Sequence, residues 1–546
     1  MLSPEFRFRN FQRSWTWWFM VAVLVVVALA RLRLLNFPLE RDEGEYAYAG
    51  QLILQGIPPY ELAYNMKFPG TYLAYAGIMA LFGQTPAGIH FGLLVMTTAT
   101  ALMLFWLGQK ILDEIAGVAA ATSYMVLAAS PSMLGLAGHA THFCAFFVTA
   151  GFCFMWQARQ KENWWTLAAS GALFGAAVLM KQHAVLVAAW AGLSFVASIF
   201  LAKESFTKRI AAVAVYGFSM LMPLALCCLW LWHAGAFGKF KFWTMDYARE
   251  YASGVPLAYA PIFFWHSISW VITNGILLWL VALGGLVLVW RDARWKNSRG
   301  WFLGFCTASA LAVCPDFYFR KHYFLIALPA LALLAGTAVS GLRQWWQEKK
   351  IVSALGDWPA WSYALFVAVT ILTGVDVWFL LPVHAIIRGT GPSDHGLYGA
   401  DPLPEAEIVA KFINENSSPA DYVAILGSEP EIYFLAHRHS ATGYIYTYAL
   451  MEPQPFALKM QHEMIADIEA NEPAFIVFAD NIMSFGLRPE SDRTLLKWWD
   501  KYQTNYTLVG MTDIVSPTNT IIVLGSNFVA HYPVAHGSAL EIYQRK

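Results

Sequence analysis

Repeated apolar segments decide what this chain can fold into. Segments long enough to cross a bilayer, which takes about 20 residues each, recur throughout the first 380 positions. Because 58% of its residues are hydrophobic and only 13% are charged, the 546-residue chain is too apolar for a set of soluble domains. Its formal net charge of zero gives no indication of nucleic acid as a partner. We therefore predict a mainly α-helical, polytopic membrane protein.

The lengths of these segments predict eleven membrane helices. They lie near residues 15–36, 88–109, 115–131, 137–157, 163–180, 183–202, 209–232, 262–290, 300–315, 322–342 and 359–381. The third and fourth segments, and the fifth and sixth, are joined by such short turns that each pair could also be one kinked helix. Basic residues before the first helix and in the alternate loops predict that these parts are cytoplasmic. An odd number of helices then places the C-terminus on the opposite side.

The composition changes after Pro382. Residues 1–382 form the predicted transmembrane module, and residues 383–546 mix amphipathic helices with short strands, which predicts a soluble α/β domain. We expect helices at 406–416 and 455–470, and strands at 422–426, 474–478, 506–511, 520–524 and 539–543. A glycine-rich phosphate loop does not occur in this part of the sequence, so we expect no nucleotide site there. The domain is expected to help select the acceptor of a reaction.

Four carboxylates crowd into six residues directly after the first apolar segment, in a long outside loop at 37–87. Asp42 and Glu45 match a capping box for a helix predicted over 43–55. Capping alone explains Asp42 and one neighbour, but not four carboxylates at the membrane surface. A carboxylate that is partly desolvated there has a raised pKa and can act as a general base toward a hydroxyl. Asp42 and Glu43 are therefore the candidate catalytic residues.

Several cations are also predicted at the outer surface. Lys67 lies at the start of a second interfacial helix, predicted over 69–83, where it could bind a phosphate or simply reach toward the interface. Lys181 interrupts an apolar stretch, where an ionisable residue is costly without a partner. Three more potential cations stand at the outer end of a helix, namely Arg320, Lys321 and His322. Because positive charge outside opposes the topology rule, a local anionic ligand is the better explanation.

Two histidines near the start of the fourth predicted helix, His139 and His142, could bind a metal ion with a third ligand. Two histidines alone are weak evidence, so we predict no metal site. No cofactor is expected, although a divalent cation could bind the acid cluster.

These motifs resemble the GT-C superfamily of membrane glycosyltransferases, specifically the bacterial branch related to protein O-mannosyltransferases and the aminoarabinose transferase of lipid A. The resemblance covers roughly residues 10–345. It rests on Arg41-Asp42-Glu43-Gly44-Glu45-Tyr46-Ala47, on Tyr60 to Gly70 with Lys67-Phe68-Pro69, on Gly175 to Lys181, and on His322-Tyr323-Phe324 followed by Leu328-Pro329-Ala330-Leu331.

The resemblance implies a GT-C helix bundle in a bacterial inner membrane, with the C-terminal domain in the periplasm. It implies transfer of a hexose or pentose from a polyprenyl-phosphate donor to a hydroxyl of a glycan, lipid or protein, with inversion. The family's first acid, here Asp42, is the base, and basic residues hold the donor phosphate. We assign the donor phosphate to Lys67, Lys181, Arg320, Lys321 and His322. Further substrate contacts are assigned to Glu45, Tyr46, Tyr323 and His142.

Two other functions compete with the transferase. Charges in and beside membrane segments also mark transporters of lipid-linked or small anionic substrates. Against a transporter, the charged residues gather at one face rather than at the midplane, and the sequence shows no inverted pair of broken helices. A scaffold or sensor that binds through its outer domain is the third possibility.

Overall fold

The computed structural model describes residues 4–161, 163–201, 205–348, 359–380, 401–516, 519–525, 532 and 538–546. The chain forms two compact units. Unit 1 comprises Met1–Arg33, Phe91–Cys227 and Ala252–Val383, and unit 2 comprises Leu34–His90, Cys228–Tyr251 and His384–Lys546. The first outside loop thus belongs to the same unit as the C-terminal α/β domain. The predicted boundary at 382/383 lies outside the described residues.

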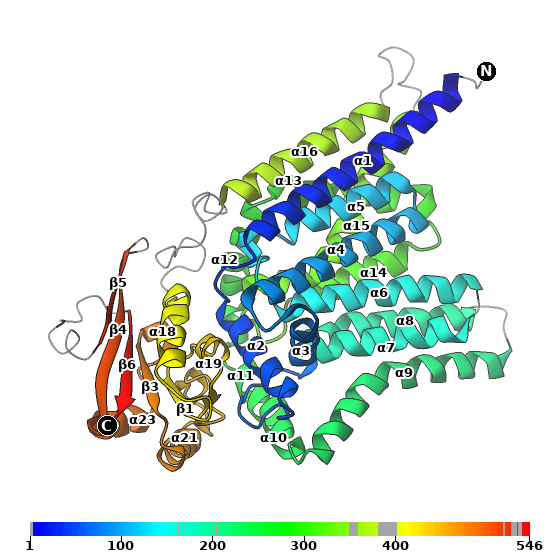
Figure 1. Ribbon diagram of the computed structural model, residues 1–546. Coiled ribbons are helices and arrows are strands. Elements are labelled where there is room, and N and C mark those ends of the chain that lie inside the picture. Colours follow the sequence, from blue (N-terminus) through cyan, green and yellow to red (C-terminus); the bar gives the residue numbers. More distant parts are fainter. Residues whose placement is uncertain are drawn as a thin grey trace. The chain divides into compact units, whose positions relative to one another are not determined.

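Unit 1 is built from helices (Figure 1). They are α1 (Pro4–Arg33), α4 (Pro86–Ile111), α5 (Glu114–Leu127), α6 (Ala140–Lys161), α7 (Trp164–Met180), α8 (Val185–Leu201), α9 (Phe206–His233), α12 (Ala260–Thr273), α13 (Ile276–Arg291), α14 (Arg299–Leu311), α15 (Leu328–Glu348) and α16 (Pro359–Leu380), with short 3-10 turns η1 (Pro131–Met133), η2 (Gln182–Ala184), η4 (Leu257–Tyr259), η5 (Ala293–Trp295) and η6 (Lys321–Ala327). Helices α4 and α9 each run from one unit into the other.

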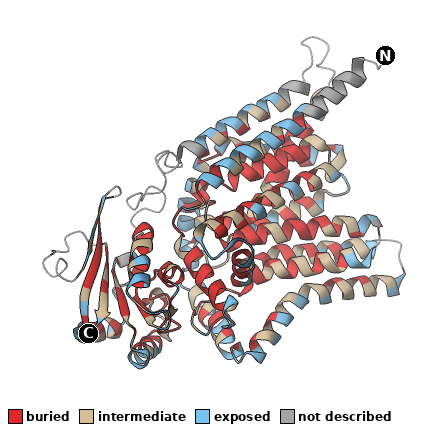
Figure 2. Ribbon diagram, in the orientation of Figure 1, coloured by how far each residue is buried: buried red, intermediate tan, exposed pale blue. Residues whose placement is uncertain are grey.

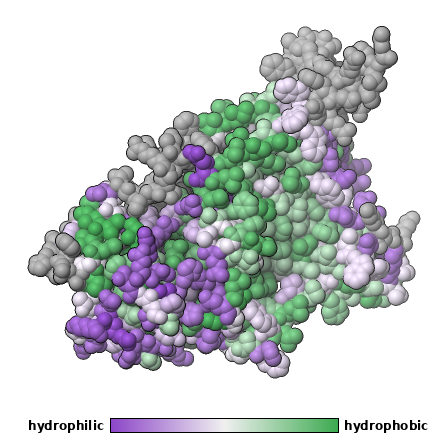
Figure 3. All heavy atoms as spheres, in the orientation of Figure 1, coloured by the Kyte–Doolittle hydropathy of each residue, from purple (hydrophilic) through white to green (hydrophobic). Residues whose placement is uncertain are grey.

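Five helical segments in the described part of the chain are long and apolar enough to cross a membrane, or six if one bent pair counts as a single span. They are Trp15–Arg33, Pro86–Ile111, Gln182–Leu201, Phe206–His233 and Lys321–Trp346. Shorter apolar helices include α5, α7 and α13. A mainly helical membrane fold is therefore confirmed, whereas the predicted number of eleven membrane helices is not. Figure 3 shows hydrophobic side chains gathered on the face of the helical part that it presents.

The core of unit 1 depends on close helix packing. Helix α15 packs between α5 and α13, and Figure 2 shows buried residues along these helices. At the crossing of α13 and α15, a Cβ on Gly285 would lie 2.1 Å from the carbonyl oxygen of Leu334, so the two backbones approach as closely as only glycine allows. Arg31, also buried, donates to the carbonyl groups of Ala128 and Gly135, both at 2.8 Å.

The predicted single helix over 262–290 is wrong, because the structure divides it into α12 and α13. Gly275 adopts a left-handed conformation with a φ of 106° and interrupts the helix. Its backbone N–H donates to the Asp376 carboxylate of α16 at 3.2 Å, so a charged side chain from another helix caps α13. The predicted helix over 322–342 also begins differently, as the 3-10 turn η6 that continues into α15.

Unit 2 contains a six-stranded sheet with the order β2-β1-β3-β6-β4-β5. Its strands are β1 (Tyr422–Leu426), β2 (His439–Ser440), β3 (Phe475–Asp480), β4 (Tyr506–Ser516), β5 (Asn519–Leu524) and β6 (Ala539–Arg545). Strands β1, β2 and β3 are parallel, while β6 pairs antiparallel with β3 and β4, and β5 antiparallel with β4. All five predicted strands are confirmed. The two-residue strand β2 is too short for its side-chain alternation to be read from the sequence.

The helices of unit 2 come from three parts of the chain. They are α2 (Arg41–Leu54), α3 (Gly70–Phe82), α10 (Phe237–Lys241), the π-helix η3 (Phe242–Tyr247), α11 (Ala248–Ala252), α18 (Leu403–Glu415), α19 (Glu431–Ala436), α20 (Tyr448–Met451), α21 (Ala457–Asn471), α22 (Ile482–Phe485), α23 (Thr494–Tyr502) and the turn η8 (Gln503–Asn505). Helices α2 and α3 pack together, and α19 packs on α2. The two helices expected in the outside loop and the two expected in the tail are all present.

Gly44 allows α19 to approach α2. A Cβ at this position would lie 2.6 Å from the Cβ of Glu431 and 2.7 Å from its backbone nitrogen. Because backbone atoms cannot move aside as the end of a flexible side chain can, only glycine fits at this contact.

We expect Gly44→Ala to destabilise unit 2 by about 1–3 kcal/mol, because the added methyl group overlaps the backbone at the start of α19. Gly77→Ala is the matched control, since Gly77 is also helical but has no atom within 4 Å of the added Cβ. The control should keep or slightly raise stability, by up to about 1 kcal/mol. Thermal unfolding of the two purified variants in detergent measures the difference, and equal midpoints would contradict the close contact.

Candidate functional site

The acid cluster forms the first turn of α2, with Glu40 as the N-cap residue. The Glu40 carboxylate accepts a hydrogen bond from the backbone N–H of Asp42 at 2.7 Å, and the backbone N–H of Glu40 donates to Glu43 at 3.1 Å. The capping box is therefore formed by Glu40 and Glu43, and the predicted pairing of Asp42 with Glu45 is wrong. Both pairs are three residues apart, so their spacing alone could not distinguish them.

Lys67 lies between the two carboxylates that the capping box leaves available. Its ammonium group is 2.8 Å from Asp42 and 2.6 Å from Glu45, and it also stands over the Tyr46 ring at 4.6 Å from the centroid. Glu45 is fully buried and accepts a second hydrogen bond from the Tyr72 hydroxyl at 2.5 Å. The structure thus brings together four of the predicted site residues, Asp42, Glu45, Tyr46 and Lys67.

Burial and ion pairing act in opposite directions on the pKa values of Glu45 and Lys67. Burial raises the pKa of Glu45, and the charge of Lys67 opposes that rise. Burial alone would lower the pKa of Lys67, but Asp42 and Glu45 hold it well above its usual value. Lys67 therefore stays charged at neutral pH, and one ammonium group is shared by two acids.

Asp42 and Glu43 differ in their exposure to solvent. The Asp42 side chain is 24% exposed, whereas the Glu43 side chain is fully buried. Glu43 also lies 3.4 Å from the ring nitrogen Nε2 of His90, whose Nδ1 bonds the carbonyl oxygen of Leu35 at 2.9 Å. Of the two predicted catalytic acids, Asp42 is therefore the one that a substrate could touch, and Glu43 supports the helix.

Unit 1 holds a second group of predicted residues, around Tyr323. The ammonium group of Lys181 stands over the Tyr323 ring at 3.8 Å, and the Tyr323 hydroxyl donates to Asp316 at 3.1 Å. His183 approaches the same carboxylate at 3.7 Å. Burial raises the pKa of Asp316, against hydrogen bonding by Tyr318 and the charge of Lys181. Three residues of the loop, Asp316, Phe317 and Phe319, have a positive φ, and such strain concentrates at functional sites.

The three predicted cations that follow this loop have separate surroundings. Arg320 is exposed and its guanidinium lies 5.2 Å from the centroid of the Tyr318 ring. Lys321 stands 4.7 Å above the Trp270 ring, and His322 stacks on His139 with ring centroids 4.0 Å apart. His142 is buried on α6, one turn after His139. All three residues thus lie beside a ring, and Arg320 is exposed to solvent.

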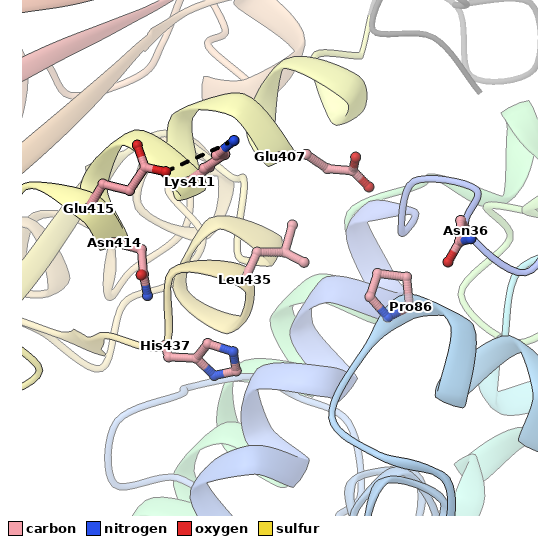
Figure 4. A pocket seen from close by; sticks show the side chains of 8 residues that line it. All are labelled: Asn36, Pro86, Glu407, Lys411, Asn414, Glu415, Leu435 and His437. Atoms are coloured by element: carbon pink, nitrogen blue, oxygen red, sulfur yellow. Dashed lines mark ion pairs between the residues drawn. The ribbon is translucent and has the colours of Figure 1, made fainter. Parts of the chain in front are cut away.

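A separate cavity of about 470 Å³ lies in unit 2 (Figure 4). Its lining comprises Asn36, Pro86, Glu407, Lys411, Asn414, Glu415, Leu435 and His437. Burial raises the pKa of Glu407 to about 7, with the charge of His90 opposing. Lys411 and Glu415 form an exposed pair one helical turn apart. The sequence predicted none of these residues as a site, because those on α18 have the spacing of an ordinary amphipathic helix and the others are distant in the sequence.

The comparisons with known proteins agree with this architecture. A sequence profile described as dolichyl-phosphate-mannose-protein mannosyltransferase matches residues 67–232. Among solved structures, ArnT from Cupriavidus metallidurans bound to undecaprenyl phosphate aligns over 97% of this chain and 98% of its own, at 15% identity and a TM-score of 0.58. AglB from Archaeoglobus fulgidus, in complex with an inhibitory peptide and a dolichol-phosphate, aligns over 96% of this chain and 75% of its own, at 13% identity and a TM-score of 0.52. The chain has a GT-C fold.

The predicted resemblance is thereby confirmed at the level of the fold, and with it a multi-pass membrane protein. A comparison with curated protein sequences gives no significant match. The likeness to ArnT extends over almost the whole of both chains and therefore includes the α/β tail, which the sequence motifs reached only loosely.

Removing the shared cation should leave the buried Glu45 carboxylate without a compensating positive charge, although it keeps the hydrogen bond from the Tyr72 hydroxyl. We expect Lys67→Met to destabilise the protein by about 3–5 kcal/mol, and the double change Lys67→Met with Glu45→Gln to recover most of that loss. Thermal unfolding in detergent measures both. Lys239→Met is the matched control, because its pair with Glu61 is exposed and should contribute no more than about 1 kcal/mol. If the double variant were as unstable as the single one, Lys67 would not serve to compensate Glu45.

Proposed function

We propose that the protein is a membrane glycosyltransferase that moves a sugar from a polyprenyl-phosphate donor to an acceptor hydroxyl. Its GT-C fold supports this, as does the match to a dolichyl-phosphate-mannose-protein mannosyltransferase profile. The structural relatives were solved with undecaprenyl phosphate and with a dolichol-phosphate, so lipid-linked phosphates fit proteins of this shape. We further propose a bacterial inner membrane, with the tail on the periplasmic side.

The observation that carries the proposal is the exposure of the Asp42 carboxylate beside Lys67. Glu40 and Glu43 cap α2, and Glu45 is buried against Lys67 and Tyr72, whereas the Asp42 side chain pairs with Lys67 and is 24% exposed. A carboxylate held in one orientation can take the proton of an acceptor hydroxyl as that hydroxyl attacks the sugar. Attack opposite the phosphate inverts the anomeric centre.

The donor phosphate is the leaving group, so cations must balance the charge that it gains. We propose that Arg320, Lys321 and Lys181 supply this charge. Each of the three lies over an aromatic ring, which orients the cation. Lys67 differs because two carboxylates already balance it, so we propose that it orients Asp42. This scheme requires no nucleotide and no metal ion.

The direct test is incubation of the purified protein with radiolabelled undecaprenyl-phosphate sugars, with mannose first, and with an envelope extract as the source of acceptors. Transfer of label to the extract supports the transferase. A donor that binds and stays intact under all conditions would contradict it and favour a transporter or a binding protein.

Asp42→Asn should reduce transfer by about 10²–10⁴-fold, because the amide keeps the shape of the side chain but cannot accept the proton. Donor binding should be retained. Glu43→Gln should have a smaller effect, acting through the orientation of the first turn of α2. The measurement is kcat in the transfer assay with donor affinity beside it. Near-normal turnover of Asp42→Asn together with loss in Glu43→Gln would reverse the assignment.

Arg320→Ala and Lys321→Ala should each weaken binding of undecaprenyl phosphate by about tenfold or more, as expected for a charge-assisted contact of roughly 1.5–3 kcal/mol. Arg299→Ala is the matched control, since Arg299 also lies over a ring, that of Trp290 at 5.1 Å, but at the other end of α14. Binding measured on protein in nanodiscs should be unchanged in this control. Unchanged affinity in both test variants would place the phosphate elsewhere.

A further inference from the structure

Arg41, the residue directly before Asp42, is the centre of an ion network within unit 2. Its guanidinium nitrogen Nη2 lies 3.0 Å from Asp401 and 3.6 Å from Glu429, which follow the first loop by several hundred residues in the sequence. The Asp401 side chain is 35% exposed, whereas the Glu429 side chain is fully buried. Asp401 is the nearer carboxylate and accepts a hydrogen bond from Arg41, while Glu429 is the partner that water cannot screen.

Glu429 is itself fixed by the sheet of the tail. It follows β1, at the edge where parallel strands end, and its Oε2 accepts hydrogen bonds from the backbone N–H of Ser428 at 2.7 Å and from the Ser484 hydroxyl at 2.8 Å. Its other oxygen faces Arg41. One carboxylate therefore connects the rigid end of β1 to the first turn of α2.

Two further contacts hold the same turn. The Tyr446 hydroxyl donates to the backbone carbonyl of Arg41 at 3.1 Å, and this tyrosine is buried. Gly44, one turn along, packs against the backbone of Glu431. The α/β domain thus contacts the Arg41 side chain, the Arg41 carbonyl group and the surface of α2 at Gly44. The sequence did not predict these contacts.

We propose that Glu429 is a positioning residue for the base Asp42 and acts through Arg41. Arg41 and Asp42 are successive residues of one helical turn, so a change in the path of Arg41 moves the Asp42 carboxylate. A displacement of about 1 Å in a reacting group can cost on the order of 10²-fold in rate. The inference rests on the proposed function, and it assigns a catalytic contribution to a domain without a reacting group of its own.

The test is the effect of Glu429→Gln on kcat and KM in the transfer assay with the whole chain. The donor is undecaprenyl-phosphate mannose, or whichever of the radiolabelled undecaprenyl-phosphate sugars is most active, and the envelope extract supplies the acceptor. We expect kcat to fall about 10–100-fold while the KM for the donor changes less than about twofold, because the donor phosphate is bound elsewhere. Arg41→Met should show the same pattern. The double variant should be no slower than the slower single variant, since both changes break one link.

Glu472→Gln is the matched control. It breaks another acid–arginine pair of the same domain, with Arg545 at 2.7 Å, on the exposed surface, and it should leave kcat unchanged. Normal kcat in folded Glu429→Gln, or losses that multiply in the double variant, would overturn the inference. If Glu429→Gln does not fold, Arg41→Met alone tests the inference, because it breaks the same link, and normal kcat in that folded variant would overturn it.

Asp42→Asn separates this inference from the proposed function. If Asp42→Asn abolishes transfer while Glu429→Gln and Arg41→Met leave it normal, only the positioning role fails. If Asp42→Asn itself keeps normal turnover, the assignment of the base fails.

Discussion

Two carboxylates, Asp42 and Glu45, share the ammonium group of Lys67, and the packing of the first part of unit 2 depends on this arrangement. A buried Glu45 without a partner would be costly, so α2 and the residues before α3 must meet closely enough for Lys67 to reach it. The Tyr60 hydroxyl donates to the Lys67 carbonyl at 2.7 Å and fixes the lysine backbone. Asp42 is the second acid on the same ammonium group, so the requirement that stabilises a buried charge also orients an accessible one.

The parts of the fold that depend on neighbouring residues were predictable from the sequence. Strand β1 is a short continuous apolar run and α21 follows helical periodicity, and their positions agree with prediction. The break between α12 and α13 could not be found in this way, because the segment is apolar on both sides of Gly275. Asp376, about a hundred residues later, supplies the cap that makes the interruption tolerable.

The sequence pointed to residues of the candidate site, but it did not reveal which of them pair with one another. Crowding of acids after the first helix pointed to Asp42, and Lys67 was recognised as part of the same loop. Which acid caps the helix was undecidable, because Glu40 with Glu43 and Asp42 with Glu45 have the same spacing. The partners of Arg41 were also hidden, since Asp401 lies 360 residues away and an arginine carries no local sign of its distant carboxylate.

The contacts of α2 change what the α/β domain can be expected to do. The Tyr48 hydroxyl accepts a hydrogen bond from the backbone N–H of Ser440 at 2.8 Å, and the backbone N–H of Tyr64 donates to the carbonyl of Gly443 at 2.7 Å. Removing the domain would break both hydrogen bonds and expose these groups to water. The domain therefore contributes hydrogen bonds to the helix that carries Asp42 and to the loop that follows it. A change in that domain can thus also move Asp42, the proposed base.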